Sequence, residues 1–83
     1  MQVTLKLYAS LGVFLPSHAK RNEVPIEVDD GTSIRALLDR FHVPPESCHL
    51  VLLNGHYQAP AMRAGVTLKP GDAVAVWPPV AGG

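Results

Sequence analysis

The spacing of apolar residues in this chain changes from that of a strand to that of a helix and back, which limits the folds it can form. Branched apolar residues recur at every second position within 2–8, 24–28 and 73–77, a pattern that predicts strands with one buried face. Between the second and third of these segments, residues 34–41 place apolar side chains along one stripe of an amphipathic helix. The sequence therefore predicts strands on both sides of one main helix.

The ends of the predicted helix are marked by residues with local physical effects. Ser33 (or Thr32) is placed to cap the first turn, because its hydroxyl can accept a hydrogen bond from a free backbone N–H. Pro44-Pro45 is expected to end the helix, since a proline excludes the helical conformation at the residue before it. The segments 9–21 and 59–67 have neither period and are expected to be irregular.

Two dipeptide patterns predict tight turns in the second half of the chain. A short strand at 50–53 is followed by Asn54-Gly55, which suits a type I′ turn because both central residues need positive φ. Pro70-Gly71 lies at the centre of a predicted type II turn. In the second strand, Pro25 cannot donate a ladder hydrogen bond and is expected at an edge or a non-bonding position.

This order of elements predicts an α+β fold, a ubiquitin-like β-grasp roll. A mixed sheet of four or five strands would carry the one main helix across one face. We expect residues 1–77 to form the domain and residues 78–83 to form a flexible C-terminal tail.

Charge and length exclude several functional classes. The 83 residues include seven basic and seven acidic side chains, so there is no basic stripe for nucleic acid. No apolar stretch is long enough to cross a bilayer. The single cysteine, Cys48, permits no disulfide within the chain and fits a reducing compartment. We therefore expect a cytoplasmic protein without a membrane or nucleic-acid partner.

The composition of the last seven residues suits a reactive C-terminal tail. They read Trp77-Pro78-Pro79-Val80-Ala81-Gly82-Gly83. The prolines restrict φ and favour an extended chain, and the two glycines have no side chain and fit a narrow channel. A carboxylate on Gly83 is ionised at neutral pH and is a poor electrophile, so it needs activation, most simply as an acyl-adenylate made from ATP. The chain has no glycine-rich phosphate loop, which implies an external activating enzyme.

The segment from Leu68 to Gly83, which reads Leu-Lys-Pro-Gly-Asp-Ala-Val-Ala-Val-Trp-Pro-Pro-Val-Ala-Gly-Gly, resembles the ThiS/MoaD sulfur-carrier family. It is most similar to the small subunit of molybdopterin synthase, whose members typically end in an aromatic residue, Pro-Pro-Val, a small residue and Gly-Gly. Asn54-Gly55 and the first strand also fit the family. Leu11-Gly12-Val13 departs from it, because members usually carry a basic residue there.

The resemblance implies that an E1-like enzyme adenylates Gly83 with ATP and that sulfur then replaces AMP to give a thiocarboxylate. A second partner, such as the large subunit of molybdopterin synthase, would accept the sulfur. The chain would be a cosubstrate or a non-catalytic subunit with no bound cofactor or metal. The residues expected to contact partners are those of the tail: Trp77, Pro78, Pro79, Val80, Ala81 and Gly82.

Several alternatives stay open. The sulfur could enter thiamine-thiazole synthesis instead, the activated Gly83 could be joined to lysines as in a ubiquitin-like protein modifier, or the domain could be an interaction module with an inert terminus. Trp77 is equally consistent with a partly buried sheet residue and with an exposed anchor. The seven-residue spacing of His42, His49 and His56 has no common geometry for a metal, and Cys48 is expected to be a small buried residue.

Overall fold

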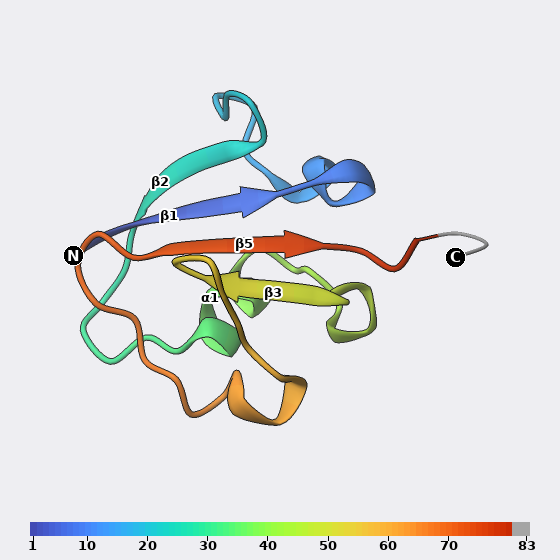
Figure 1. Cartoon of the computed structure of the whole chain (residues 1–83). Coiled ribbons are helices and arrows are strands. Elements are labelled where there is room, and N and C mark those ends of the chain that lie inside the picture. The colour runs from blue at the N-terminus through green and yellow to red at the C-terminus, as the bar shows by residue number, and fades with distance from the viewer. Residues whose placement is uncertain (81–83) are drawn as a thin grey trace.

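The computed structural model describes residues 1–80 of the chain, which contain five strands, one α-helix and three short 3₁₀ helices. Figure 1 shows their arrangement in space. In chain order the elements are β1 (Gln2–Leu7), η1 (Ala9–Phe14), β2 (Glu23–Glu27), α1 (Ile34–Arg40), η2 (Pro45–Ser47), β3 (Leu50–Leu53), β4 (His56–Tyr57), η3 (Pro60–Met62) and β5 (Ala73–Trp77). No helix among the described residues is both long and apolar enough to cross a membrane.

The five strands form one mixed sheet in the order β2-β1-β5-β3-β4. The first and last strands of the chain, β1 and β5, pair in parallel at the centre of this sheet, while the remaining pairs are antiparallel. β5 therefore lies between β1 and β3, with a partner along both of its edges (Figure 1). The mixed sheet with one main helix is the predicted architecture, and its strand count is the upper of the two expected numbers.

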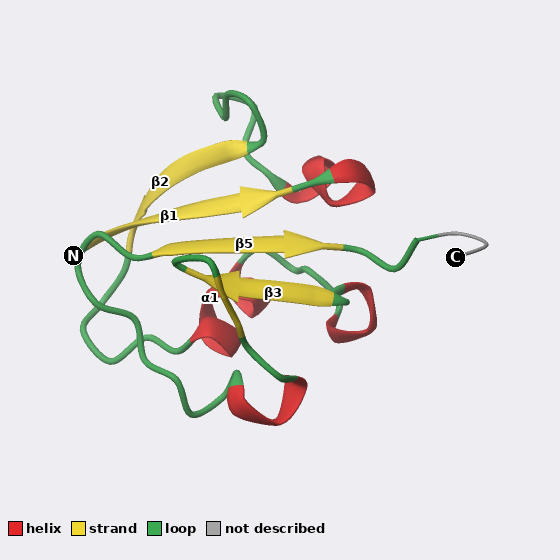
Figure 2. Cartoon of the chain, in the orientation of Figure 1, coloured by secondary structure: helices red, strands yellow, loops and turns green. Residues whose placement is uncertain are grey.

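The core lies between the sheet and α1, which covers one face of the sheet (Figure 2). Alternate residues of the strands point to this face, as the two-residue period predicts. The core residues contributed by β1, β2, α1, β3 and β5 are Val3, Leu5, Leu7, Val24, Ile26, Ile34, Leu37, Leu38, Val51, Val74 and Val76. Among residues 1–80, no helix lies over the opposite face of the sheet, which we call the outer face (Figure 2).

Helix α1 begins at its predicted cap, because the Ser33 hydroxyl accepts a hydrogen bond from the Ala36 N–H at 3.0 Å. It ends at Arg40, before the proline pair that was expected to stop it. His42 has a left-handed conformation with φ 62°, and the Val43 N–H donates to the Leu38 carbonyl at 3.1 Å. This bond satisfies a carbonyl of the last turn, so the helix is closed by its own backbone.

Both predicted tight turns are confirmed. Asn54 and Gly55 have φ values of 51° and 86°, which are the signs that a type I′ turn requires between β3 and β4. Gly71 has φ 83°, and the Asp72 N–H donates to the Lys69 carbonyl at 3.1 Å to close the type II turn before β5.

The two segments expected to be irregular each contain a short 3₁₀ helix. Residues 9–14 form η1, which buries Leu11 in the core, and residues 60–62 form η3. These helices hold i to i+3 bonds such as Leu15 N–H to the Gly12 carbonyl at 3.1 Å. Runs this short leave no apolar period in a sequence, which is why the pattern did not predict them.

Pro25 lies in the edge strand β2, as predicted. Met1 and Val28 exchange both backbone hydrogen bonds at 2.8 Å, and bonded pairs alternate along an antiparallel ladder. The pair Thr4 and Pro25 is therefore a non-bonding pair, and the missing N–H of Pro25 faces the open edge of the sheet.

Candidate functional site

The strand that precedes the predicted C-terminal tail is β5, the central strand of the sheet. At its end, the Tyr8 N–H donates to the Val76 carbonyl and the His49 N–H donates to the Trp77 carbonyl, each at 3.1 Å. The backbone is thus held from both sides up to Trp77. The end of β5 is therefore anchored by hydrogen bonds on both of its edges.

The chain leaves the sheet at Pro78. Pro78 is half-buried, whereas Pro79 and Val80 are exposed, Val80 to 78%. No backbone hydrogen bond joins any of these three residues to another of residues 1–80. In Figure 1 they extend past the end of the sheet. The predicted sites Ala81, Gly82 and Gly83 lie outside the described residues. Their assignment, and that of 78–83 as a tail, stays a prediction.

Trp77 is partly buried and stacks on Tyr8 at the point where the tail begins. The two ring centroids are 4.5 Å apart and the planes differ by 11°, a parallel stack that fixes both rings. Both side chains lie on the outer face, so Trp77 belongs to the sheet and also borders the tail. Sequence reasoning did not single out Tyr8. The alternation within 2–8 places it on this face, but no pattern in the sequence pairs it with Trp77.

Around the stack, the outer face of β3, β4 and β5 is apolar. Registered pairs place Leu50 beside Trp77, and Leu52 beside both Ala75 and Tyr57. Tyr57 is 58% exposed, and the other four side chains are of intermediate exposure. We call these five residues with Tyr8 the outer apolar patch. A contiguous apolar patch on a sheet face is a candidate protein-interaction surface.

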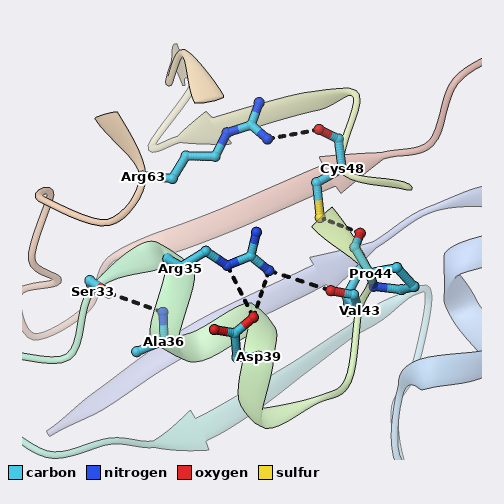
Figure 3. A network of polar contacts seen from close by, with 8 residues as sticks. All are labelled: Ser33, Arg35, Ala36, Asp39, Val43, Pro44, Cys48 and Arg63. Atoms are coloured by element: carbon cyan, nitrogen blue, oxygen red, sulfur yellow. Dashed lines mark hydrogen bonds and ion pairs between the residues drawn. The ribbon is translucent and has the colours of Figure 1, made fainter. Parts of the chain in front are cut away.

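Cys48 is buried, as predicted, and its thiol donates to the Pro44 carbonyl at 3.4 Å (Figure 3). Burial raises the pKa of this thiol above its ordinary value, despite the opposing effect of Arg35 and Arg63. A nucleophilic cysteine needs a lowered pKa and access to substrate. Cys48 is therefore not placed to attack an activated terminus.

The three histidines that recur every seven residues lie on different parts of the fold. His42, His49 and His56 lie after α1, before β3 and in β4 respectively. Among residues 1–80, no group of three or more histidine, cysteine or acidic side chains is arranged to hold a metal ion.

Arg63 was not foreseen from the sequence. It is buried, and its guanidinium donates to the Cys48 carbonyl at 2.7 Å and to the Gln58 carbonyl at 3.0 Å. Figure 3 shows the side chain reaching across to the backbone of Cys48. A buried charge in a segment without periodicity has no sequence signature, because the carbonyls that hold it are brought together only by the fold.

Taken together, a mixed five-stranded sheet with one main helix, and residues 78–80 leaving the end of its central strand, define a ubiquitin-like β-grasp fold. The family model described as the ThiS family matches residues 14–83. The chain belongs to this family, as the sequence resemblance implied. No curated protein matches the sequence.

Solved structures of the same fold come from archaea and bacteria. The crystal structure of SAMP1 from Haloferax volcanii is 26% identical, with 100% of both chains covered and a TM-score of 0.69. The Haloferax volcanii protein HVO 2177 is 28% identical over 100% of this chain and 87% of that one, with a TM-score of 0.65. Subunit 1 of the molybdopterin-converting factor of Helicobacter pylori 26695, solved in complex with subunit 2, is 25% identical over 100% of both chains, with a TM-score of 0.59.

Proposed function

We propose that this protein is a sulfur carrier that works through the carboxylate of Gly83. An activating enzyme would join the carboxylate to the α-phosphate of ATP and release pyrophosphate. A sulfide nucleophile would then attack the acyl carbon and displace AMP, leaving a thiocarboxylate on Gly83. The chain supplies the reacting group and the partner enzyme supplies the catalysis, so we assign this protein the role of cosubstrate.

The observation that carries the proposal is the way in which the tail leaves the sheet. β5 is held on both sides up to the Trp77 carbonyl, and the next residues, 78–80, extend beyond the domain. Six residues beyond Trp77 span at most about 20 Å, long enough to carry Gly83 into an enzyme's site while the domain stays outside. Glycines at the end would enter a channel that excludes any side chain.

The outer apolar patch supports a second part of the proposal, namely the docking of partners beside the tail. It surrounds Trp77 on the strand that ends in the tail, so one partner can hold both at once. The Helicobacter pylori relative was solved as a complex of subunits 1 and 2. We therefore favour a synthase large subunit as the sulfur acceptor and molybdopterin as the product. Thiamine-thiazole synthesis is the second pathway.

The alternative is conjugation to other proteins through Gly83. It is favoured by the similarity to small archaeal modifier protein 1 of Haloferax volcanii, which is 27% identical over 95% of this chain and 98% of that chain. Carrier and modifier share adenylation and differ in the nucleophile that follows. Conjugates of higher mass in cells that express the tagged chain, lost on deletion of Gly83, would support the modifier.

Intact mass spectrometry after incubation with an E1-like enzyme, ATP and a sulfur donor tests the carrier. We expect a mass gain equal to the exchange of one oxygen for sulfur. Deleting Gly83, or adding one residue after it, should abolish the gain. Lys69→Ala, at the turn before β5, is the matched control and should leave it intact. A full gain in the chain with one added residue would overturn the proposal.

A further inference from the structure

A second surface lies at the same end of the sheet as the tail. It is an open pocket of about 430 Å³ between the loop before β2 and the start of that strand. Its lining residues are His18, Lys20, Arg21, Glu23 and Pro25. Two of these are permanent cations and one is a histidine. The single carboxylate, on Glu23, is 3.9 Å from the Lys6 ammonium and is thus partly neutralised.

A tight turn presents the two cations. The Lys20 and Glu23 backbones exchange both hydrogen bonds at 3.0 Å, and between them Arg21 and Asn22 have φ values of 53° and 65°. These are the signs of a type I′ turn, for which asparagine and glycine are preferred. An arginine in this conformation is uncommon and costs energy. The turn therefore holds Arg21 at its tip although the left-handed conformation is unfavourable for arginine.

The turn is firmly attached to the sheet. The Asn22 side-chain amide donates to the Leu7 carbonyl, and the Leu7 N–H donates to the Asn22 carbonyl, both at 3.0 Å. Neither Lys20 nor Arg21 forms an ion pair with any of residues 1–80. The pocket thus offers two cations on a fixed frame, both available to a ligand.

Register places this pocket close to the tail. Asn22 lies beside Leu7, and Leu7 lies beside Val76, one residue before Trp77. Neighbouring strands are about 4.8 Å apart, so the turn is separated from β5 by about 10 Å. Figure 1 shows the start of β2 and the arrowhead of β5 at the same end of the sheet. A partner that covers about 800 Å² around Trp77 would also reach the pocket.

We propose that the pocket formed by His18, Lys20, Arg21, Glu23 and Pro25 binds an acidic segment of the enzyme that activates the tail. This inference rests on the proposed function for its partner and on the pocket itself for its chemistry. Carboxylates of the partner would pair with Lys20 and Arg21 at the rim of the interface. Rim charges mainly raise the rate of encounter and set its salt dependence.

The first experiment tests the pocket without any enzyme. A hexaglutamate peptide is titrated into the ¹⁵N-labelled chain at low ionic strength, with hexalysine as the opposite charge. We expect saturable amide shifts at residues 18–23 with hexaglutamate alone, reduced at least about fivefold in apparent affinity in Lys20→Gln/Arg21→Gln. The control Arg40→Gln/Lys69→Gln removes the same charge elsewhere and should bind like the parent. Equal binding by both double variants would overturn the proposal.

The second experiment measures adenylation rate against carrier concentration with the activating enzyme. Lys20→Gln/Arg21→Gln should raise KM about tenfold in low salt with kcat unchanged, and the difference should shrink at high salt as charges are screened. An unchanged KM would sink the acidic-segment inference and leave the carrier proposal standing. If the parent chain is not adenylated at all, the carrier proposal fails, and the peptide titration still decides whether the pocket binds acidic segments.

Discussion

At the scale of single residues, Arg63 connects three parts of the chain that are distant in sequence. Its guanidinium holds the carbonyls of Cys48 and Gln58, and its own carbonyl accepts the Arg35 N–H at 3.0 Å. The buried side chain thus fixes the loop before β3 and the segment after β4, and the backbone of the same residue holds the first turn of α1. Such a residue stabilises the side of the domain opposite to β2.

We expect Arg63→Ala to lower the free energy of unfolding by about 3 kcal/mol, because buried carbonyls lose a charged donor. The control is Arg40→Ala, which removes a bond of 2.7 Å to the Glu27 carbonyl at an exposed site and should cost less than about 1 kcal/mol. Urea unfolding followed by tryptophan fluorescence measures both. Equal losses in the two variants would show that burial of Arg63 adds nothing.

Cys48 gives the domain a pH dependence of known sign. Burial raises the pKa of its thiol in the folded state, so the unfolded chain ionises first as pH rises. The free energy of unfolding should therefore be unaffected by this group below about pH 8.5 and fall above it, by at most about 1.4 kcal/mol per pH unit. Comparing the parent with Cys48→Ala by urea unfolding between pH 7 and 10 isolates the effect. A stability difference that is constant across this range would contradict the prediction.

At the scale of elements, two glycines allow backbone conformation to be tested apart from packing. A Cβ at Gly71 would contact nothing within 4 Å, yet φ is 83°. Gly71→Ala should therefore destabilise the domain by about 1–2 kcal/mol through the backbone alone. Gly65, whose φ is not in the left-handed region and whose added Cβ would lie 3.9 Å from the Met62 carbonyl, is the control. Gly65→Ala should be neutral or stabilise by up to about 1 kcal/mol in thermal unfolding. Equal effects would contradict the argument.

The elements also show how far sequence reasoning reached. The main strands and the helix were predicted from the spacing of apolar residues, and both tight turns from the dipeptides Asn54-Gly55 and Pro70-Gly71. These signals lie within a few residues of the element that they specify, so they can be read from the sequence. The closing of α1 at His42 did not follow, since a left-handed histidine has no sequence signature. The order of the sheet is equally hidden, because it depends on contacts between β1 and β5 across the whole chain. Of the candidate site, Trp77 was named from the sequence and the tail at 78–83 stays a prediction, whereas Tyr8 and the pocket at 18–25 were not foreseen.

At the scale of the whole molecule, the open edge of β2 is protected against pairing with another chain. Pro25 removes an outward donor, and Arg40 donates to the Glu27 carbonyl. Edge strands with free donors and acceptors promote aggregation, and proline is one of the devices that prevent it.

Restoring free hydrogen-bonding groups at the edge of β2 should therefore make copies of the protein associate with one another. Pro25→Val combined with Arg40→Ala supplies a donor and frees an acceptor, and we expect dimers or larger species that increase with concentration in light scattering. Pro79→Val, which changes a proline outside the sheet, is the control and should stay at the mass of the parent. A monomeric edge variant at millimolar concentration would refute this view of β2.

The position of β5 has a consequence for how the molecule is made. Residues 73–77 are synthesised after the other four strands, and they form the central strand on which both halves of the sheet depend. Until they emerge, β1 and β3 have no partner between them, so the native sheet must close after synthesis of this segment is complete. A nascent chain cut short before Ala73 would be left open to proteolysis. Residues 78–80 would therefore extend from a complete sheet only in molecules in which β5 has joined β1 and β3.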